Sequence, residues 1–141
     1  MDWIYSTSAT AHGGRQGRIT TASGNLDLEA GPLPQFGGDP EAHLTNPEEL
    51  FACGYAACFH NALIVVAAKR EIDISGSTVT CTAGLGGEKL ELVAELEVSL
   101  PGIDREMAEK LVERAHRICP YSRATKGNVD VPITVVDPAP A

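Results

Sequence analysis

The most apolar stretch of the chain runs from Asn46 to Ala68. It begins like a helix, because Asn46 can cap free backbone N–H groups, Pro47 suits the first helical position, and two glutamates follow. The rest of the stretch is almost wholly apolar, which predicts a helix buried at the centre of the fold. Cys58 lies inside it, on one helical stripe with Phe51, Tyr55, Ala62 and Val65.

The segment before this helix predicts short strands followed by a loop. Residues 3–30 alternate apolar and polar positions between glycine-rich turns, and the turn over residues 12–18 carries two arginines. Residues 31–45 hold three prolines and several glycines, which is typical of a long loop. Loops of this length in a small domain are usually functional or covered by a partner.

Three later segments show the two-residue period of strands. Residues 78–85 place Val79, Cys81, Ala83 and Leu85 on one face, and residues 90–100 alternate apolar residues with glutamates. The second pattern predicts a half-buried antiparallel strand. A last strand is expected over residues 129–135, where Pro132 favours a sheet edge or a bulge.

One further helix lies between these strands. Asp104 can cap a helix that runs to about Ile118, and Pro120 is expected to stop it. Its predicted inward positions are Met107, Ala108, Leu111, Val112, Ala115 and Ile118. The element order is a β-rich start, helix, two strands, helix and strand, which predicts an α+β fold.

Length and charge narrow the function. With 141 residues, 43% of them hydrophobic, we expect one domain, made of a β-rich arm and loop (1–45) and a core (46–141). A net charge of −8 argues against nucleic acid or an anionic membrane as the main partner. The apolar run ends at Lys69 and Arg70, short of a membrane span, and the N-terminus does not resemble a signal peptide.

A cytoplasmic location follows, and it changes how the four cysteines are interpreted. In a reducing compartment they are more typical of catalysis, metal binding or incidental use than of structural disulfides. A lone buried cysteine such as Cys58 is ordinarily a small core residue. The alternative is a reactive thiolate, and it needs a nearby cation because burial alone raises a thiol pKa.

Arg15 and Arg18 are the candidate cations. An arginine in an apolar site needs a carboxylate of its own, which Glu48 or the glutamate after it can supply. Glu48 precedes Cys58 by ten residues, about 15 Å along an unbroken helix. One arginine therefore reaches both only if the helix breaks near Gly54, or if the two come from different elements or subunits.

The other cysteines differ in their expected roles. Cys119 lies in a turn at a helix end and is expected to be more accessible than Cys81, which fits a core position in a strand. A helix C-terminus disfavours a thiolate, so Cys119 suits a thiol that reacts second. Arg123 and Lys126 can offset that effect, although such loop charges are usually solvated.

A zinc site is the competing use of these residues. Cys58 and His60, with His116 and Cys119, offer two thiols and two imidazoles. The first two are only two positions apart and point to nearly opposite sides of a helix. That geometry disfavours a tetrahedral metal site.

Three motifs, in this order, resemble the organic hydroperoxide resistance (Ohr) branch of the OsmC/Ohr superfamily. They are Thr-Ala-His-Gly-Gly-Arg-x-Gly-Arg at 10–18, the segment 45–59 with Asn-Pro-Glu-Glu-Leu-Phe-Ala and Gly-Tyr-Ala-Ala-Cys-Phe, and the segment 115–131. The last contains Cys-Pro-Tyr-Ser, which points to this branch rather than the osmotically induced one. Cys53 stands where the family commonly has alanine.

The resemblance implies a fold and an activity. The fold is an intertwined homodimer with antiparallel sheets packed around two central helices and sites at the subunit interface. The activity is a thiol peroxidase that reduces organic, especially lipid-type, hydroperoxides to alcohols without a metal or cofactor. The implied reductant is a dihydrolipoyl group on a lipoylated protein.

The resemblance also assigns roles to four residues. Cys58 matches the thiol that becomes a sulfenic acid, and Cys119 matches the one that captures it as a disulfide. Arg15 matches the arginine against the reactive sulfur, and Glu48 the carboxylate that orients it. Phe51, Tyr55 and Phe59 are expected around Cys58 as an apolar substrate pocket.

Three other functions stay open. The chain can be a peroxidase of the osmotically induced type, or a general disulfide oxidoreductase, although it lacks a Cys-x-x-Cys motif. It can also be a redox-sensing or ligand-binding dimer whose thiols react without multiple turnover.

Overall fold

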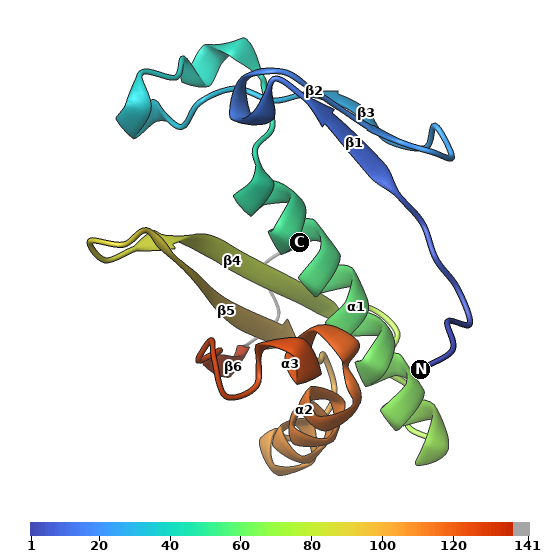
Figure 1. Cartoon of the computed structure of the whole chain (residues 1–141). Helices are drawn as coiled ribbons and strands as arrows, with labels where there is room; N and C mark the ends of the chain where they lie inside the picture. The colour runs from blue at the N-terminus through green and yellow to red at the C-terminus, as the bar shows by residue number, and fades with distance from the viewer. Residues whose placement is uncertain (137–141) are drawn as a thin grey trace. The chain divides into compact units, whose positions relative to one another are not determined.

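The computed structural model describes residues 1–136 and divides the chain into two units (Figure 1). The first covers residues 1–50 and the second begins at residue 51. The expected boundary between arm and core, after residue 45, falls close to this division. That the whole chain forms one domain stays a prediction.

The first unit contains a three-stranded antiparallel sheet in the order β1 (Ala9–His12), β2 (Arg18–Thr21), β3 (Asp27–Glu29). A short 3-10 helix, η1 (Gly14–Gln16), lies in the turn between β1 and β2. A Cβ at Gly17 would lie 1.6 Å from the His12 carbonyl oxygen, so this tight turn requires glycine. The sheet begins later than predicted, because residues 3–8 form no strand.

The expected loop contains two short 3-10 helices, η2 (Pro34–Phe36) and η3 (Pro40–Ala42). A single bridge joins its ends, where Ala30 pairs with Thr45. The Gly31 N–H also donates to the Thr45 carbonyl over 3.0 Å. The loop is therefore closed at its base.

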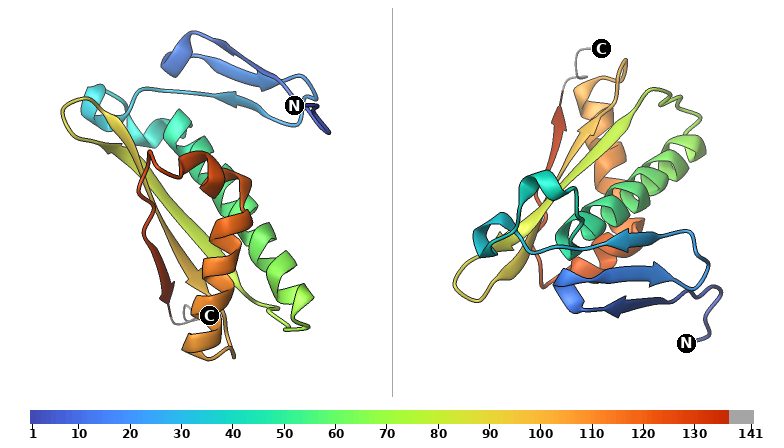
Figure 2. Two further views of the ribbon diagram at one scale, coloured as in Figure 1. Left: turned by 60° about the horizontal axis from the view of Figure 1, so that its bottom comes forward. Right: turned by 90° about the horizontal axis from the view of Figure 1, so that it is seen from above.

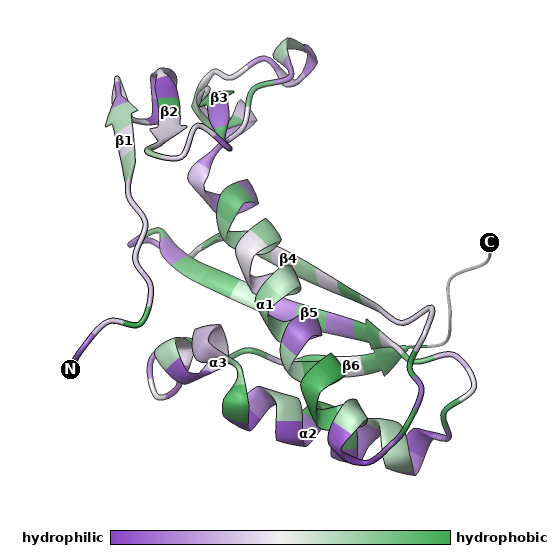
Figure 3. Ribbon diagram, turned by 90° about the vertical axis from the view of Figure 1, so that its right-hand side faces the viewer, coloured by the Kyte–Doolittle hydropathy of each residue, from purple (hydrophilic) through white to green (hydrophobic). Residues whose placement is uncertain are grey.

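Helix α1 (Pro47–Lys69) runs without a break through Gly54. Its start is as predicted, because the Glu49 N–H donates to the Asn46 side-chain oxygen over 2.8 Å. Its apolar residues are spread around the helix rather than confined to one face, and much of the helix is green in Figure 3. It is long and apolar enough to cross a membrane, so the expectation that no apolar run reaches this length was wrong. Core helices of water-soluble proteins have the same length and composition.

The second sheet has the order β4 (Thr78–Gly86), β5 (Glu91–Ser99), β6 (Ile133–Val136). Strands β4 and β5 are antiparallel, as predicted. The expectation of purely antiparallel sheets was wrong for β6, which runs parallel to β5 with Ile133 opposite Leu96. A helical crossover separates β5 from β6 in the chain, and such a connection permits parallel pairing. Pro132 precedes β6, which lies at the sheet edge as its proline indicated.

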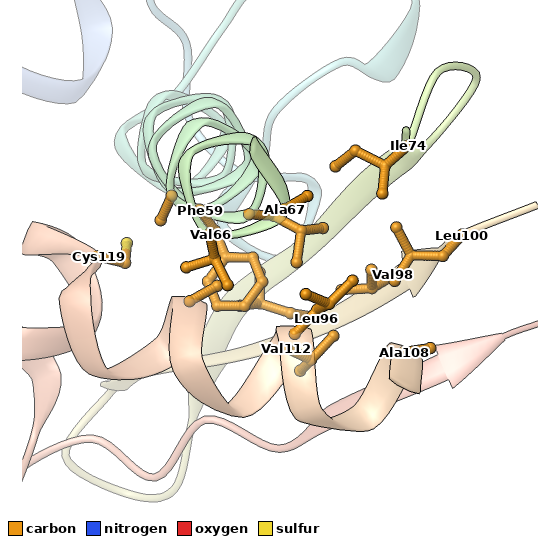
Figure 4. Packing of buried hydrophobic residues seen from close by; sticks show 14 of the residues in the cluster. Phe59, Val66, Ala67, Ile74, Leu96, Val98, Leu100, Ala108, Val112 and Cys119 are labelled. Carbon is orange, nitrogen blue, oxygen red and sulfur yellow. The ribbon is translucent and has the colours of Figure 1, made fainter. Parts of the chain in front are cut away.

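Helix α2 (Arg105–Ile118) begins at the predicted cap, where the Asp104 carboxylate accepts from the Met107 N–H over 2.9 Å. Helices α1 and α2 lie on the same face of the second sheet (Figure 2). Between them and β5 lies the hydrophobic core, which includes Phe59, Val66, Leu96, Val98, Leu111 and Val112 (Figure 4). The predicted inward positions of α2 hold except at Ile118, which is 40% exposed.

Pro120 ends α2 and also begins a further helix that the sequence did not indicate, α3 (Pro120–Thr125). Proline suits this first helical position because no intrahelical partner is needed there. Cys119 is the junction residue that closes α2 and precedes α3. The two sheets with their helices confirm the predicted α+β class.

Candidate active site

Two cysteine side chains meet in the second unit. Cys58 lies on α1 and is half-buried, whereas Cys119, at the junction of α2 and α3, is fully buried. Their sulfur atoms are 3.7 Å apart and both thiols are free. A disulfide requires a sulfur–sulfur distance of about 2.05 Å, so a small rotation of the side chains brings them within bonding distance.

The accessibility expected for Cys119 was wrong. Its side chain points into the core rather than outward from the turn, and it joins the same hydrophobic cluster as Phe59 and Leu111 (Figure 4). Cys81, on β4, is half-buried and packs against that cluster, consistent with its expected core role. Cys53 is exposed on α1.

The surroundings of Cys58 disfavour its thiolate. Burial raises the pKa of the Cys58 thiol, the backbone N–H of Tyr121 acts to lower it, and the side chain of Cys119 raises it further. Burial is the largest of these effects. A reactive Cys58 at neutral pH therefore requires a cation beside it, as the sequence argument anticipated.

Aromatic side chains pack next to the two thiols. The rings of Phe51, Tyr55 and Tyr121 have centroids 5.7 to 6.1 Å apart. Phe51 is half-buried, while Tyr55 and Phe59 are fully buried and belong to the core. A Cβ at Gly54 would lie 2.6 Å from the Tyr121 hydroxyl oxygen. The glycine on α1 therefore leaves space for the Tyr121 side chain, which comes from α3.

A chain of polar side chains also joins the three helices. The hydroxyl groups of Tyr55 and Ser122 are 2.7 Å apart, and the Ser122 oxygen lies 2.7 Å from Nδ1 of His116. Burial lowers the pKa of His116, which favours the neutral imidazole. The sequence predicted His116 as an interface or surface histidine rather than a metal ligand, and it indicated no role for Ser122.

His60, the other histidine considered for a zinc site, contacts a serine. Nε2 of His60 lies 2.9 Å from the Ser77 hydroxyl oxygen. Across residues 1–136, no three His, Cys, Asp or Glu side chains are grouped so that they could hold a metal ion.

The first unit contains the predicted arginine–carboxylate pair. Two nitrogens of the Arg15 guanidinium donate to the two oxygens of Glu48, over 2.8 and 2.7 Å. Arg15 lies in η1, and its side chain is 46% exposed. Glu48 lies in the first turn of α1, and its side chain is 10% exposed. The hydrogen bonds from Arg15 lower the pKa of Glu48, and those to Glu48 raise the pKa of Arg15.

The alternatives to this pair have other partners. Arg18 donates to Asp27 over 2.6 Å and to Glu29 over 3.3 Å. Glu49 accepts from the Thr45 hydroxyl over 2.9 Å. The choice that the sequence left open is thus resolved in favour of Arg15 with Glu48, while a contact between Arg15 and Cys58 stays a prediction.

Comparison with known proteins identifies the family. Residues 38–134 match the family model described as OsmC-like protein. The organic hydroperoxide resistance protein of Xanthomonas axonopodis pv. citri is 40% identical over 135 residues, which cover 94% of each chain. This chain belongs to the Ohr family of OsmC-like proteins.

Other Ohr proteins agree in sequence and in fold. The organic hydroperoxide resistance protein OhrB of Bacillus subtilis is 42% identical over 134 residues, covering 91% of this chain and 95% of that protein. The crystal structure of an organic hydroperoxide resistance protein from Elizabethkingia anophelis superposes with a TM-score of 0.89 at 41% identity, covering 97% and 99% of the two chains. Membership of the Ohr family links the chain to peroxide-related redox chemistry.

Proposed function

We propose that this protein is a cysteine-based peroxidase that reduces organic hydroperoxides to alcohols. The separation of 3.7 Å between the Cys58 and Cys119 sulfur atoms carries the proposal, because it suits two thiols that react in turn. The Ohr relatives, whose name describes resistance to organic hydroperoxides, support the choice of substrate class.

The proposed cycle has three steps. The Cys58 thiolate attacks the outer peroxide oxygen, the O–O bond breaks, and the other oxygen leaves with a proton as the alcohol. Cys58 is then a sulfenic acid. The Cys119 sulfur attacks the Cys58 sulfur, forming a disulfide and releasing water as Cys119 gives up its proton. An external dithiol then reduces the disulfide by thiol exchange and is itself oxidised.

Burial decides the order of the two thiols. Cys119 is fully buried, so an incoming peroxide meets the half-buried Cys58 first. The backbone N–H of Tyr121 favours the thiolate at Cys58, since it acts to lower that thiol's pKa. Cys58 is therefore assigned as the nucleophile and Cys119 as the resolving thiol.

The missing cation is assigned to Arg15, oriented by Glu48 and supplied by a second copy of the chain. Helix α1 is unbroken between Glu48 and Cys58, a length of about 15 Å. An arginine held at Glu48 by two hydrogen bonds therefore suits the thiol of another subunit better than that of its own. Arg15 would stabilise both the thiolate and the charge on the leaving oxygen.

The surface of α1 supports a homodimer. An exposed stripe with helical spacing runs along it and is formed by Cys53, Ala57, Asn61, Ile64 and Ala68. Most of these positions are apolar, and Ile64 is 47% exposed in the single chain. A contiguous exposed apolar surface on a helix that is otherwise buried is typical of an interface.

The half-buried ring of Phe51 and the aromatic cluster beside it would favour apolar peroxides over hydrogen peroxide. The proposed reductant is a dihydrolipoyl group, free or on a lipoylated protein. The test compares turnover with a fatty-acid hydroperoxide, tert-butyl hydroperoxide and hydrogen peroxide, each with dihydrolipoamide. We expect many turnovers and the fastest rate with the lipid peroxide. A single oxidation without turnover would instead favour a redox sensor.

A further inference from the structure

We infer that Tyr55, Ser122 and His116 form a hydrogen-bonded clamp that positions Cys119 for attack on Cys58. The inference rests on the proposed peroxidase cycle and adds three positioning residues to its second step. None of the three is assigned to contact the peroxide through its polar group. Their role is to hold three helices in the arrangement that keeps the two sulfurs within reach of each other.

The clamp connects every element that carries a reacting thiol. Tyr55 lies on α1, three residues before Cys58, and His116 lies on α2, three residues before Cys119. Ser122 lies on α3, three residues after Cys119. Residues three apart lie on the same side of a helix, so each hydrogen-bonding group is one turn from a thiol.

The contacts are short, and two of the three residues are buried. The Ser122 oxygen lies 2.7 Å from both the Tyr55 oxygen and Nδ1 of His116. Tyr55 is fully buried and Ser122 is 2% exposed. A buried polar group left without a partner costs roughly 1 to 3 kcal/mol, so the three groups strongly favour remaining together.

The available protons decide which group donates and which accepts in each hydrogen bond of the clamp. A neutral imidazole with its proton on Nε2 accepts at Nδ1, which suits a hydrogen bond donated by Ser122. Ser122 then accepts from the Tyr55 hydroxyl, and every group has a partner. Burial keeps His116 neutral by lowering its pKa, so this arrangement is the favoured one near neutral pH.

The geometry of the second step explains why a clamp is useful. Formation of the disulfide has to shorten the sulfur–sulfur distance from 3.7 Å to about 2.05 Å. Displacement of α3 away from α1 would lengthen this path and leave the Cys58 sulfenic acid unprotected. Excess peroxide would then oxidise it further to the sulfinic acid, which a dithiol does not restore.

The test separates the two oxidation steps in the full-length protein. Ser122→Ala removes the hydroxyl group at the centre of the clamp. Tyr55→Phe removes the hydroxyl group at one end of the clamp and keeps the aromatic ring, so it disturbs packing less. Thr125→Val is the matched control, because it deletes a buried hydroxyl from α3 that donates to the Ser122 carbonyl and does not belong to the clamp. Samples quenched after mixing with tert-butyl hydroperoxide are analysed by mass spectrometry for Cys58 sulfenic acid, Cys58 sulfinic acid and the disulfide.

In both clamp variants we expect the disulfide to form roughly 10- to 100-fold more slowly, with accumulation of sulfinic acid, and in Ser122→Ala we expect Cys58 to be oxidised at the unmodified rate. Thr125→Val should form the disulfide at the unmodified rate. Unchanged disulfide formation in both clamp variants would overturn the inference, as would equal slowing by Thr125→Val. Failure of the proposed function is distinguishable, because the unmodified protein would then form no Cys58–Cys119 disulfide, or would form it once without multiple turnover in the presence of dihydrolipoamide.

Discussion

The two units carry different chemical groups. The first presents a charged pair, Arg15 with Glu48, whose guanidinium is nearly half exposed. The second presents two free thiols in an apolar setting, where burial raises the pKa of Cys58. The proposed peroxidase requires both groups, because a buried thiol becomes a thiolate near neutral pH only with a cation beside it. A buried thiol can be kept in a stable core if its activating charge is carried on a separate part of the fold.

The largest expected effect comes from removing the nucleophile. Cys58→Ser should lower peroxidase turnover roughly a thousandfold or more, because a serine hydroxyl does not attack peroxide oxygen at this site. The control is Cys53→Ser, which changes an exposed thiol on the same helix. Turnover with tert-butyl hydroperoxide and dihydrolipoamide measures both variants. Full activity in Cys58→Ser would refute the assignment.

Removing the cation should have the next largest effect. We expect Arg15→Ala to lower the rate of Cys58 oxidation about 100-fold, because stabilisation of the thiolate and the leaving oxygen is lost. Arg18→Ala is the matched control, since Arg18 pairs with Asp27 and Glu29 instead. Equal losses in the two arginine variants would indicate a general effect of charge on the first unit.

Mixed dimers would show whether the Arg15 and the Cys58 of one active site come from different subunits. A dimer of one Arg15→Ala chain and one Cys58→Ser chain contains one intact site if Arg15 acts across the interface. Turnover should then rise to about half that of the unmodified dimer, which has two intact sites. Activity no higher than that of the Arg15→Ala dimer would mean that each chain uses its own arginine.

The smallest expected effect is on stability in mild acid. Because burial lowers the pKa of His116 below its ordinary value of 6.5, the folded state binds this proton less readily than the unfolded state. The folded protein is therefore fully stable, as far as His116 is concerned, above pH 6.5. It loses stability as the pH falls from 6.5 toward the lower pKa that His116 has in the folded state. Arg117, Arg123, Lys126 and Asp130 line the same pocket as His116.

Thermal unfolding between pH 8 and pH 5 measures this loss. His116→Gln should flatten the dependence in the part of that range below pH 6.5, because it removes the group that titrates there. His60→Gln is the comparison variant, since His60 lies outside the clamp and bonds to Ser77. An identical pH dependence in His116→Gln and the unmodified protein would exclude His116 as the source.

The features that sequence reasoning predicted are mostly local. The start of α1 at Asn46 and the cap of α2 at Asp104 depend on residues three positions away, and both are as expected. The alternation along β5 likewise predicted its buried face. Such patterns are set by the period of one element and need no knowledge of its neighbours.

The features that it missed depend on long-range packing. The burial of Cys119 follows from α3 turning at Pro120, and the parallel pairing of β6 follows from where the crossover ends. The hydrogen bond between Tyr55 and Ser122 joins residues 67 positions apart. No spacing along the chain indicates that these two hydroxyl groups meet.

The central claim is that Cys58 and Cys119 react in sequence, and one measurement tests it directly. The reduced protein is treated with one equivalent of tert-butyl hydroperoxide, free thiols are alkylated, and peptides are mapped by mass spectrometry. The account predicts a disulfide between Cys58 and Cys119, formed as one equivalent of alcohol appears, with Cys53 and Cys81 alkylated. Alcohol production with all four thiols still free, or with oxidation confined to Cys53, would contradict it.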